Sequence, residues 1–475
     1  MASDRLFGTD GIRGAFGRAP LDRATVHAAG QALATQLRAA DGPTRVVLGG
    51  DTRDSTPTLC QWLIAGLADG GLDPARDVVH LGTATTPCLA FAVAHDAAIG
   101  AGVAVSASHN PHPDNGIKLL AADGGKWTKV DEAALEDALR TIRSALDPAA
   151  LPAPAPLPAV DDAMHEAYLA HLVAVAGDAM DLAGDDPSSR PLVGLHVVLD
   201  AAYGAASPIA GPLFTRLGAT TTVLHDAPDG RNINRGAGST HPEALTAAVR
   251  ARAAQLSRDV PVIGFAFDGD ADRAILVDAD GAIRDGDAML YLWARALDAR
   301  DALPGKAIVA TSMSNLGLED ALAAVDIAVV RCDVGDRAVV ETLRARGLAL
   351  GGEQSGHLVH LAHGPTGDGL RTAIILAADL LRGGRPLTQR LAAFRRYPQR
   401  LENVRVAAKP ALDTLPRVVA ARQRVEDALG RRGRLVLRYS GTEPLVRIMI
   451  EASDRATIDT LTAELAAVLT EEIGA

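Results

Sequence analysis

The sequence predicts an α/β fold, made of three related α/β domains with mainly parallel sheets and a smaller C-terminal α+β domain. Two observations lead to this prediction. A strand–helix–strand pattern occurs three times along the 475 residues, and units of this kind form parallel sheets with right-handed crossovers. Beyond residue 401 the pattern changes to three strands and two long helices, which is typical of a separate, smaller domain.

The first unit begins with an apolar strand predicted at residues 44–51, which ends in Gly49-Gly50-Asp51. Thr56-Pro57 begins the next helix and Gly70-Gly71 ends it, because Ser or Thr before Pro favours a helix start and glycine a helix stop. A second strand follows at residues 78–81. The loops after such strands are candidate sites, because ligands bind at the carboxyl ends of parallel strands.

The same order of elements is predicted twice more. Ser207-Pro208 begins the helix of the second unit and Gly218 ends it, while the helix of the third unit begins near Asn315. The flanking strands are predicted at residues 195–199 and 221–224 in the second unit, and at 306–310 and 327–330 in the third.

Polar and proline-rich segments separate these units. Residues 147–160 hold five prolines and form a stiff connector. Residues 257–261 are a shorter polar break, and the glycines of 382–386 begin a third boundary. The predicted domains are therefore 1–150, 161–258, 259–382 and 390–475. In the last domain, strands are predicted at 403–407, 434–437 and 446–451, and helices at about 415–428 and 456–469.

Composition excludes several classes of partner. The formal net charge of −11 argues against nucleic acid and anionic membranes, and an aromatic content of 3% leaves few stacking platforms for bases. No run approaches the 18 apolar residues of a membrane span, and the first residues lack the apolar core of a signal peptide. Cys60, Cys88 and Cys332 show no paired or metal-like spacing. We therefore expect a cytoplasmic protein.

The most informative loop follows an apolar strand at residues 102–105. The strand breaks into a polar run that contains Ser106, Ser108 and His109, and two prolines then prevent a helix from starting. A hydroxyl held at a strand end, with Lys118 nearby in sequence, is well placed to carry a group covalently. The alternative is an ordinary surface turn, because Ser, His, Asn and Pro are common loop residues.

A second loop, Asp268-Gly-Asp-Ala-Asp-Arg273, follows the strand predicted at 262–267. Three carboxylates at alternate positions converge when a hard divalent cation cancels their repulsion, and oxygen-only ligands favour Mg²⁺ or Ca²⁺. An EF-hand is excluded because Arg273 stands where its glycine belongs and Ala279 where its glutamate belongs. The alternative is a solvated acidic turn.

Three further loops hold candidate binding residues. In Arg438-Tyr-Ser-Gly-Thr-Glu-Pro444, the side chains of Arg438, Ser440 and Thr442 and the amides around Gly441 can form a phosphate nest, although a plain hairpin turn also fits. Glu353 and Ser355, in a glycine-flanked loop, can bind vicinal hydroxyls of a sugar. The third loop sets Asp10 and Arg13 among glycines whose spacing is not the dinucleotide fingerprint.

Together these segments resemble the phosphohexomutase superfamily. The resemblance spans nearly the whole chain in order, and three further segments are similar to the glucosamine branch of that superfamily. The superfamily motifs are Phe7-Gly-Thr-Asp-Gly-Ile-Arg-Gly14, Ser106-Ala-Ser-His-Asn-Pro111, Asp268-Gly-Asp-Ala-Asp-Arg273, Gly352-Glu-Gln-Ser-Gly-His357 and Arg438-Tyr-Ser-Gly-Thr-Glu-Pro444. The segments of the glucosamine branch are Met313-Ser-Asn-Leu-Gly317, Asn232-Ile-Asn234 and Ser239-Thr-His-Pro-Glu243.

The resemblance implies four domains around a central cleft and a phosphomutase, an isomerase. The implied reaction interconverts glucosamine 6-phosphate and glucosamine 1-phosphate through a phosphoserine enzyme and a sugar bisphosphate, and it feeds UDP-N-acetylglucosamine and cell-wall synthesis. It also implies a homodimer. Two positions depart from the commonest pattern, since Ala271 stands where glycine is frequent and Tyr439 where Pro or Lys is frequent.

The resemblance also implies a role for each candidate residue. Ser108 would carry the phosphoryl group, and His109 would orient its loop. Lys118 and Arg13 would handle protons and stabilise charge. The expected Mg²⁺ ligands are Ser108, Asp268, Asp270 and Asp272, and the expected substrate-binding residues are Arg273, Glu353, Ser355, Arg438, Ser440, Gly441 and Thr442.

Three alternatives remain open from the sequence. A sister mutase would act on glucose or mannose phosphates, since a few hydrogen bonds decide between these sugars. An aspartyl-phosphate phosphatase would use Asp268 as its nucleophile, although Asp272 does not fit the usual motif of that class. A non-catalytic sensor of sugar phosphates could also use the same scaffold.

Overall fold

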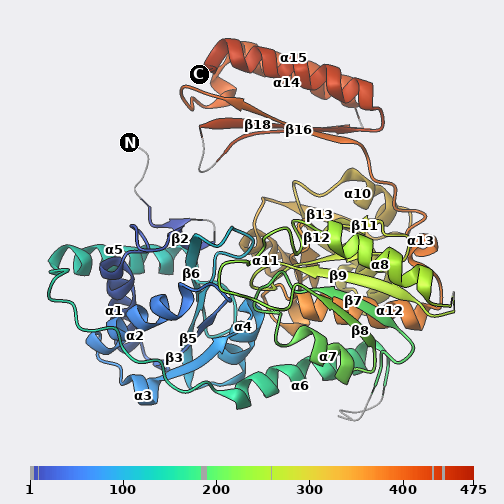
Figure 1. Ribbon diagram of the computed structural model, residues 1–475. Helices are drawn as coiled ribbons and strands as arrows, with labels where there is room; N and C mark the ends of the chain where they lie inside the picture. The colour runs from blue at the N-terminus through green and yellow to red at the C-terminus, as the bar shows by residue number, and fades with distance from the viewer. Residues whose placement is uncertain (1–4, 9, 183–189, 258, 431–432, 441–443) are drawn as a thin grey trace.

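Four β-sheets organise the described part of the chain, one in each domain (Figure 1). The structure is a computed structural model that describes all residues except 1–4, 9, 183–189, 258, 431–432 and 441–443. Within the described part, no helix is long and apolar enough to cross a membrane.

The first sheet has six strands in the order β1-β2-β6-β5-β3-β4. Alternate residues of β3 face opposite layers. Val46 and Leu48 pack in one core with α1, α2 and α5, while Val47 packs in another with α4, as the two-residue period of a strand requires. The elements are β1 (Phe7–Gly8), β2 (Gly11–Ala15), α1 (Arg23–Ala39), β3 (Arg45–Gly50), α2 (Thr56–Asp69), α3 (Pro74–Asp77), β4 (Val78–Thr83), α4 (Thr86–His95), β5 (Ile99–Val105), β6 (Asp114–Leu120) and α5 (Lys129–Ala145).

The second sheet has five strands in the order β11-β10-β9-β7-β8. Its elements are α6 (Asp162–Ala179), β7 (His196–Asp200), α7 (Ala210–Arg216), β8 (Thr220–Leu224), α8 (Glu243–Gln255), β9 (Val262–Phe267), β10 (Ala274–Val277) and β11 (Ile283–Arg284). The loop of three aspartates connects β9 to β10 and therefore belongs to this second domain.

This placement corrects the sequence prediction, which began the third domain at residue 259. Strand β9 pairs in parallel with β7 from Val262 to Ala266, and every residue of β9 is buried. The polar break at 257–261 is therefore the turn from α8 into β9 within one domain, and it does not link two domains. A buried strand needs hydrogen-bonded neighbours on both sides, and β9 finds them in β7 and β10.

The third sheet has four strands in the order β13-β12-β14-β15. Its elements are α9 (Gly286–Asp298), η1 (Pro304–Lys306), β12 (Ala307–Thr311), α10 (Leu316–Ala323), β13 (Ala328–Cys332), α11 (Asp336–Arg346), β14 (Leu350–Gly352), β15 (Leu358–His360), η2 (Leu361–His363), α12 (Gly369–Gly383) and α13 (Leu387–Arg390).

The first three sheets are mixed, whereas the sequence predicted mainly parallel sheets. In each sheet the parallel strands begin at one edge, and the innermost of them continues into a hairpin: β5 with β6, β9 with β10, and β14 with β15. A short loop can join only antiparallel neighbours, because a parallel pair needs a crossover of a dozen or more residues. The hairpins matter for function because the serine, aspartate and Glu353 loops are their three connections.

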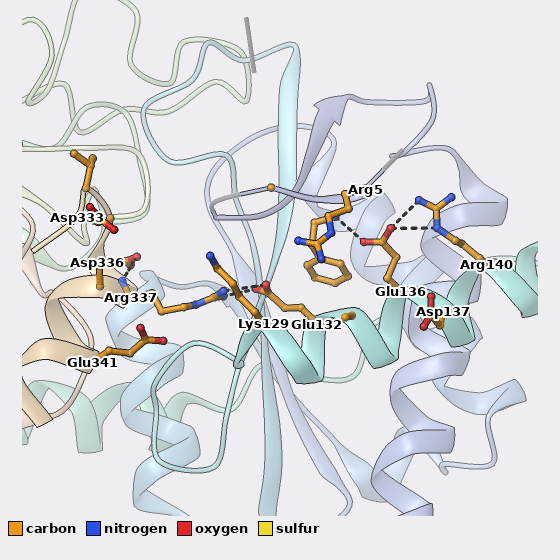
Figure 2. Close-up of a pocket in the computed structure, with 16 residues that line it drawn as sticks. Arg5, Lys129, Glu132, Glu136, Asp137, Arg140, Asp333, Asp336, Arg337 and Glu341 are labelled. Atoms are coloured by element: carbon orange, nitrogen blue, oxygen red, sulfur yellow. Dashed lines mark hydrogen bonds and ion pairs between the residues drawn. The ribbon is translucent and has the colours of Figure 1, made fainter. Parts of the chain in front are cut away.

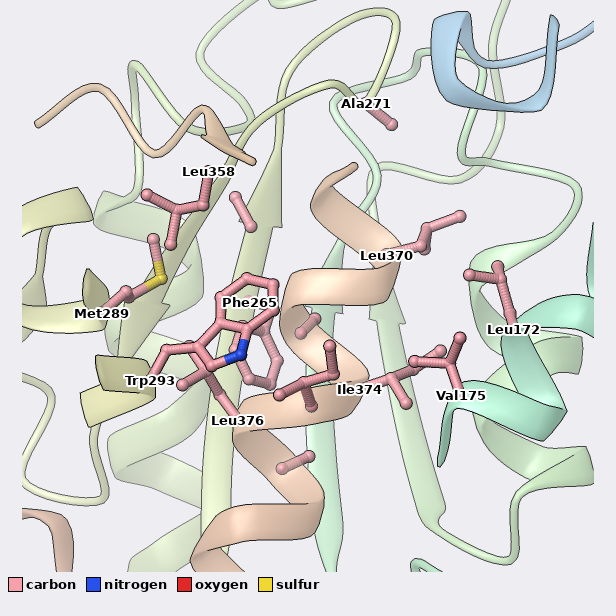
Figure 3. Packing of buried hydrophobic residues seen from close by; sticks show 14 of the residues in the cluster. Leu172, Val175, Phe265, Ala271, Met289, Trp293, Leu358, Leu370, Ile374 and Leu376 are labelled. Atoms are coloured by element: carbon pink, nitrogen blue, oxygen red, sulfur yellow. The ribbon is translucent and has the colours of Figure 1, made fainter. Parts of the chain in front are cut away.

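The second and third domains share one hydrophobic core, shown in Figure 3. Helix α12 lies at its centre, where Leu370, Ile374 and Leu376 pack among side chains from both domains. Phe265 comes from β9 and Trp293 from α9. Since cores of this kind are packed at crystal-like density, the loops that emerge from the two domains are held in fixed relation.

The fourth domain is a three-stranded antiparallel sheet covered by two helices, and Figure 1 shows it above the other three. Its elements are β16 (Gln399–Arg405), η3 (Leu412–Thr414), α14 (Pro416–Leu429), β17 (Gly433–Tyr439), β18 (Leu445–Ala452) and α15 (Arg455–Ile473). Its core, which includes Val446, Ile448 and Leu465, is a cluster distinct from those of the other domains. The predicted α+β class of this domain is confirmed.

Close packing of α1 on α2 gives a test of the fold. A Cβ at Gly66 would overlap the backbone carbonyl of His27, whereas a Cβ at Gly177 in α6 would meet nothing within 4 Å. We expect Gly66→Ala to destabilise the protein by about 1–3 kcal/mol through overpacking. Gly177→Ala should stabilise it by about 0.4–1 kcal/mol, because alanine restricts the unfolded chain. Midpoints of urea unfolding measure both, and equal midpoints for the two variants would contradict this packing.

Candidate active site between the first and second domains

Ser108 lies directly after β5, at the beginning of the β5–β6 connection. It is buried, with 1% of its surface exposed, and its φ of 53° lies in the left-handed region that serine seldom adopts. Its N–H donates to Ser106 Oγ at 2.9 Å, and Ser106 Oγ donates in turn to Asp51 Oδ2 at 2.5 Å. The unusual backbone is therefore held by polar groups beneath the loop.

The Ser108 hydroxyl meets the three aspartates predicted to hold a metal. Ser108 Oγ donates to Asp268 Oδ2 at 2.5 Å, across the boundary between the first two domains. Carboxylate oxygens of Asp268, Asp270 and Asp272 all lie within 4.8 Å of one another, and all three residues are buried. The serine and the acidic triplet are thus close enough to share one ion.

Lys118 supplies part of the compensating charge. Its Nζ lies 2.6 Å from Asp270, 3.4 Å from Asp272 and 3.2 Å from Asp10, and its side chain is 1% exposed. Burial opposes the charged form of Lys118, but Asp10, Asp270 and Asp272 outweigh it and raise the lysine pKa well above its ordinary value. Lys118 is therefore an ammonium ion at neutral pH.

The aspartates of the triplet differ in how well their negative charge is stabilised. Burial, followed by the charges of Asp272 and Asp270, raises the pKa of Asp268 well above its ordinary value. Burial also opposes ionisation of Asp272, but Lys118 and His357 hold the pKa of Asp272 well below its usual range. The buried Oδ1 atoms of Asp270 and Asp272 accept no hydrogen bond from the described residues. Free oxygen lone pairs beside a crowded carboxylate suit a hard divalent cation.

Two predicted catalytic residues flank the serine. His109 Nδ1 lies 3.3 Å from Ser108 Oγ. Burial, together with the nearby Arg273 and Arg13, lowers the pKa of His109 to about 4, so its imidazole is neutral at pH 7. Arg13 pairs with the carboxylate of Asp10 and donates to Asn110 Oδ1 at 3.4 Å.

Arg273 lies directly beside the acidic triplet. Its N–H donates to Asp268 Oδ1 at 3.2 Å, and its Nε lies 3.7 Å from Asp272. Burial disfavours the arginine charge, but Asp272 and Asp268 outweigh it and raise the Arg273 pKa. Arg273 is thus a fixed positive charge at the edge of the candidate metal site.

The β14–β15 hairpin brings the candidate sugar-binding loop to the same cluster. Its His357 has Nδ1 3.7 Å from Asp272. Glu353 Oε1 accepts the N–H of Gly335 at 3.1 Å, which ties the loop to the start of α11. Ser355 is exposed. The loop therefore contacts the acidic cluster through His357 and leaves Ser355 open to a ligand.

The fourth domain presents two arginines beside the third. Arg438 on β17 is the cross-strand partner of Arg447 on β18, and both line a small hollow with Met313. Ser440 is buried, and its carbonyl accepts from Lys409 Nζ at 2.7 Å. Gly441 and Thr442, which the sequence also assigned to this phosphate nest, lie outside the described residues. Two arginines directly opposite each other favour an anion between them.

Sequence reasoning missed the charged neighbours of this site. Lys126 Nζ lies 2.5 Å from Asp336 Oδ2 and also pairs with Asp10, and His357 Nε2 lies 3.7 Å from the same Asp336 oxygen. Asp336 begins α11 in the third domain, so these pairs join the third domain to the first. Three aspartates in one loop predict that cations lie nearby to balance their charge, but the sequence does not show which cations these are.

A cavity of about 940 Å³ opens beside this cluster, between the first and third domains (Figure 2). Helix α5 forms one wall and the start of α11 the other. Arg337 spans them by donating to both carboxylate oxygens of Glu132, at 2.5 and 3.1 Å. Asp336 lines the cavity and also pairs with Lys126, so this residue is shared by the cavity and the charged cluster. Its size is that of a small-molecule site.

Comparisons with known proteins agree with this architecture. Four models of the phosphoglucomutase/phosphomannomutase family match the chain in order: alpha/beta/alpha domain I at residues 4–146, domain II at 166–281, domain III at 285–397 and the C-terminal domain at 401–468. The phosphoglucosamine mutase of Symbiobacterium thermophilum is 43% identical over 474 residues and 99% of both chains. That of Solibacter usitatus is 40% identical over all of both chains. This chain belongs to the phosphoglucosamine mutase family of phosphohexomutases.

Solved structures of other phosphohexomutases share the fold. A phosphoglucomutase/phosphomannomutase family protein from Burkholderia thailandensis aligns with a TM-score of 0.75 and 26% identity, covering 99% of this chain and 98% of that one. An N-acetylphosphoglucosamine mutase from Aspergillus fumigatus, in complex with GlcNAc-6P and magnesium, aligns with a TM-score of 0.60 and 17% identity, covering 98% and 95%. As a phosphoglucosamine mutase family member, the chain is a phosphomutase, an isomerase.

The departure at Ala271 falls on a position whose backbone conformation favours glycine. Ala271, where the family frequently has glycine, adopts a φ of 56° between two of the aspartates. This left-handed conformation costs an L-residue roughly 1–2 kcal/mol, which glycine avoids. The aspartate loop therefore keeps a left-handed backbone at Ala271 without the glycine that makes it easy.

Removal of Lys118 tests the charge balance. We expect Lys118→Met to destabilise the protein by about 3–5 kcal/mol in the presence of a chelator, because it leaves buried carboxylates uncompensated. Saturating Mg²⁺ should recover part of the loss, since a bound cation stabilises the folded state. Thermal unfolding with EDTA and with Mg²⁺ measures both effects. The control is Lys306→Met, which removes an exposed ion pair with Asp298 and should cost about 1 kcal/mol or less. Equal losses of stability for the two substitutions would show that Lys118 does not compensate the buried carboxylates.

Proposed function

We propose that this protein interconverts glucosamine 6-phosphate and glucosamine 1-phosphate through a phosphorylated Ser108 and glucosamine 1,6-bisphosphate. The observation that carries the proposal is the 2.5 Å contact between Ser108 Oγ and Asp268, within a buried triplet of carboxylates. An isomerase of this kind needs a donor that later becomes the acceptor, and a serine hydroxyl beside a cation site can be both. The product would feed UDP-N-acetylglucosamine and cell-wall synthesis.

We propose Mg²⁺ as the resident ion, held by Asp268, Asp270, Asp272 and a phosphate oxygen on Ser108. The donor set supports this choice, because it contains only oxygen atoms and Mg²⁺ prefers oxygen ligands. A related mutase also crystallised with magnesium. When bound, the ion would neutralise charge on the phosphoryl group during transfer.

The charged residues around Ser108 would stabilise the transfer. In the forward half-reaction the bond between Ser108 Oγ and phosphorus breaks while the sugar hydroxyl forms a new bond to phosphorus, and the hydroxyl proton replaces the one that Lys118 gives to Ser108 Oγ. Lys118 is held as an ammonium by its carboxylate neighbours, so we assign it charge stabilisation and proton donation to Ser108 Oγ. Arg13 adds positive charge on the same side. Neutral His109 would orient the loop by its contact with the serine oxygen.

Binding of the substrate would use residues of the second, third and fourth domains. Glu353 and Ser355 would hold sugar hydroxyls, and Arg273 would bind substrate at the edge of the metal site. The phosphate that is not transferred would bind Arg438, Ser440, Gly441 and Thr442. The position of Arg447 opposite Arg438 supports adding it to this clamp. A clamp on a domain of its own would let the bisphosphate bind in either orientation.

We further propose that the protein works as a cytoplasmic homodimer. The three cysteines are free, which fits a reducing compartment. The dimer rests on the family resemblance and on the frequency of twofold assemblies among soluble oligomers.

Replacing Ser108 tests the phosphoserine. We expect Ser108→Ala to lose about 10³-fold or more of the mutase activity, and to gain no phosphate when incubated with glucose 1,6-bisphosphate, because the covalent carrier is gone. Turnover assays and intact-mass spectrometry measure the two effects, with Ser144→Ala on the exposed face of α5 as control. Hydrolysis of the sugar phosphate that survives Ser108→Ala would favour the phosphatase that uses Asp268. If the wild-type protein neither converts the sugar phosphate nor takes up phosphate, the non-catalytic sensor of sugar phosphates would be favoured.

The sugar preference can be measured directly. We expect kcat/KM to be highest for glucosamine 6-phosphate among the glucosamine, glucose and mannose phosphates. Preference for glucose 6-phosphate by more than about tenfold, which is about 1.4 kcal/mol of transition-state discrimination, would instead identify a sister mutase.

A further inference from the structure

Asn234 belongs to a segment that the proposed chemistry does not use. The segment Asn232-Ile-Asn234 lies between β8 and α8 of the second domain and holds no catalytic or metal-binding group. Asn234 is nevertheless buried, with 8% of its surface exposed, and its φ of 58° is left-handed. A buried polar side chain on a strained backbone calls for a specific partner.

That partner is the backbone of the serine loop. Asn234 Nδ2 donates to the carbonyl of Ser108 at 2.9 Å and to the carbonyl of Asn110 at 3.1 Å. The same two carbonyls accept from Arg53 of the first domain, at 3.4 and 2.6 Å. The serine loop is therefore held from both domains, and Asn234 provides the hold from the domain that carries the aspartates.

The aspartate loop joins the same contact. A Cβ at Gly269 would lie 2.5 Å from the Ser108 carbonyl oxygen and 3.0 Å from Asn234 Nδ2, so only glycine allows the three groups to meet. Gly269 lies between Asp268 and Asp270, two of the proposed Mg²⁺ ligands. The Ser108 carbonyl, the Asn234 amide and the backbone of the aspartate loop thus pack directly on one another.

We propose that Asn234 is a positioning residue that sets the Ser108 hydroxyl at its distance from the metal-binding aspartates. This inference rests on the proposed function. Asn234 acts through the backbone of Ser108, so its loss should slow phosphoryl transfer and weaken metal use. The residues proposed to hold the sugar hydroxyls and the phosphate that is not transferred lie in the third and fourth domains, so KM should change little.

The chemistry of the amide explains why this residue is asparagine. One amide nitrogen carries two hydrogens and can donate to two carbonyls at once. Asparagine also tolerates the left-handed backbone better than most residues. Aspartate keeps the shape and the backbone preference but turns an acceptor toward two carbonyl oxygens, whereas glycine keeps only the backbone conformation. These two substitutions therefore separate the hydrogen bonds from the backbone.

The test compares Asn234→Asp and Asn234→Gly with the wild-type enzyme. The measurements are kcat and KM for glucosamine 6-phosphate, the rate of Ser108 phosphorylation by glucose 1,6-bisphosphate, and the Mg²⁺ concentration that half-saturates this phosphorylation. We expect both variants to lower kcat and the phosphorylation rate by about 10- to 100-fold, since misplacement by an ångström costs about that much. The Mg²⁺ requirement should rise several-fold, and KM should stay within about twofold.

Asp301→Gly is the matched control, because Asp301 has a φ of 52° and is exposed, outside the residues assigned to catalysis or binding. It should match the wild type in every measurement. Asn234 variants that only lower the Tm, with kcat and Mg²⁺ requirement unchanged, would reduce Asn234 to a structural residue, and a change in KM alone would also overturn the inference. Failure of the wild type to convert glucosamine 6-phosphate would reject the proposed function, and this role with it.

Discussion

The structure depends on how it balances a concentration of buried negative charge. Three aspartates converge within one loop, and a serine hydroxyl donates to one of them. Such a group is stable only when cations surround it, because unpaired buried charges are costly. Lys118 comes from the first domain, Arg273 from the second and His357 from the third. Charge compensation therefore assembles three domains around one point.

The packing joins the first three domains through a shared core and leaves the fourth domain with a core of its own. One core runs through the second and third domains and reaches the first by α4, so the loops that meet at the charge cluster rise from a continuous scaffold. The fourth domain has its own core and offers arginines from its sheet. In the proposed mechanism, the first three domains would position the reacting groups, and the fourth would hold the distal phosphate of a substrate that binds in two orientations.

Much of this was predictable from local sequence, because the serine and the aspartates follow apolar strands directly and polar residues at strand ends mark sites. The sequence could not assign β9 to the second sheet, since that depends on its pairing with the distant β7. The antiparallel pairs were not predicted because β6 and β10 follow short loops whose residues indicate a site and not a hairpin. No role was predicted for Lys126, Asp336 or Asn234, because their contacts exist only where separate domains touch.

Strand pairing in the hairpin that carries Ser108 fixes the side of the sheet on which Lys118 lies. Lys118 on β6 stands opposite Ala104 on β5, and side chains alternate between the two faces of a strand. Insertion or deletion of a single residue within β6, between Asp114 and Lys118, would turn the ammonium to the opposite side of the sheet, where α1 and α2 pack. The place of Lys118 along β6 is therefore as much a part of the candidate site as its identity, and natural variation should preserve that place even where the neighbouring letters change.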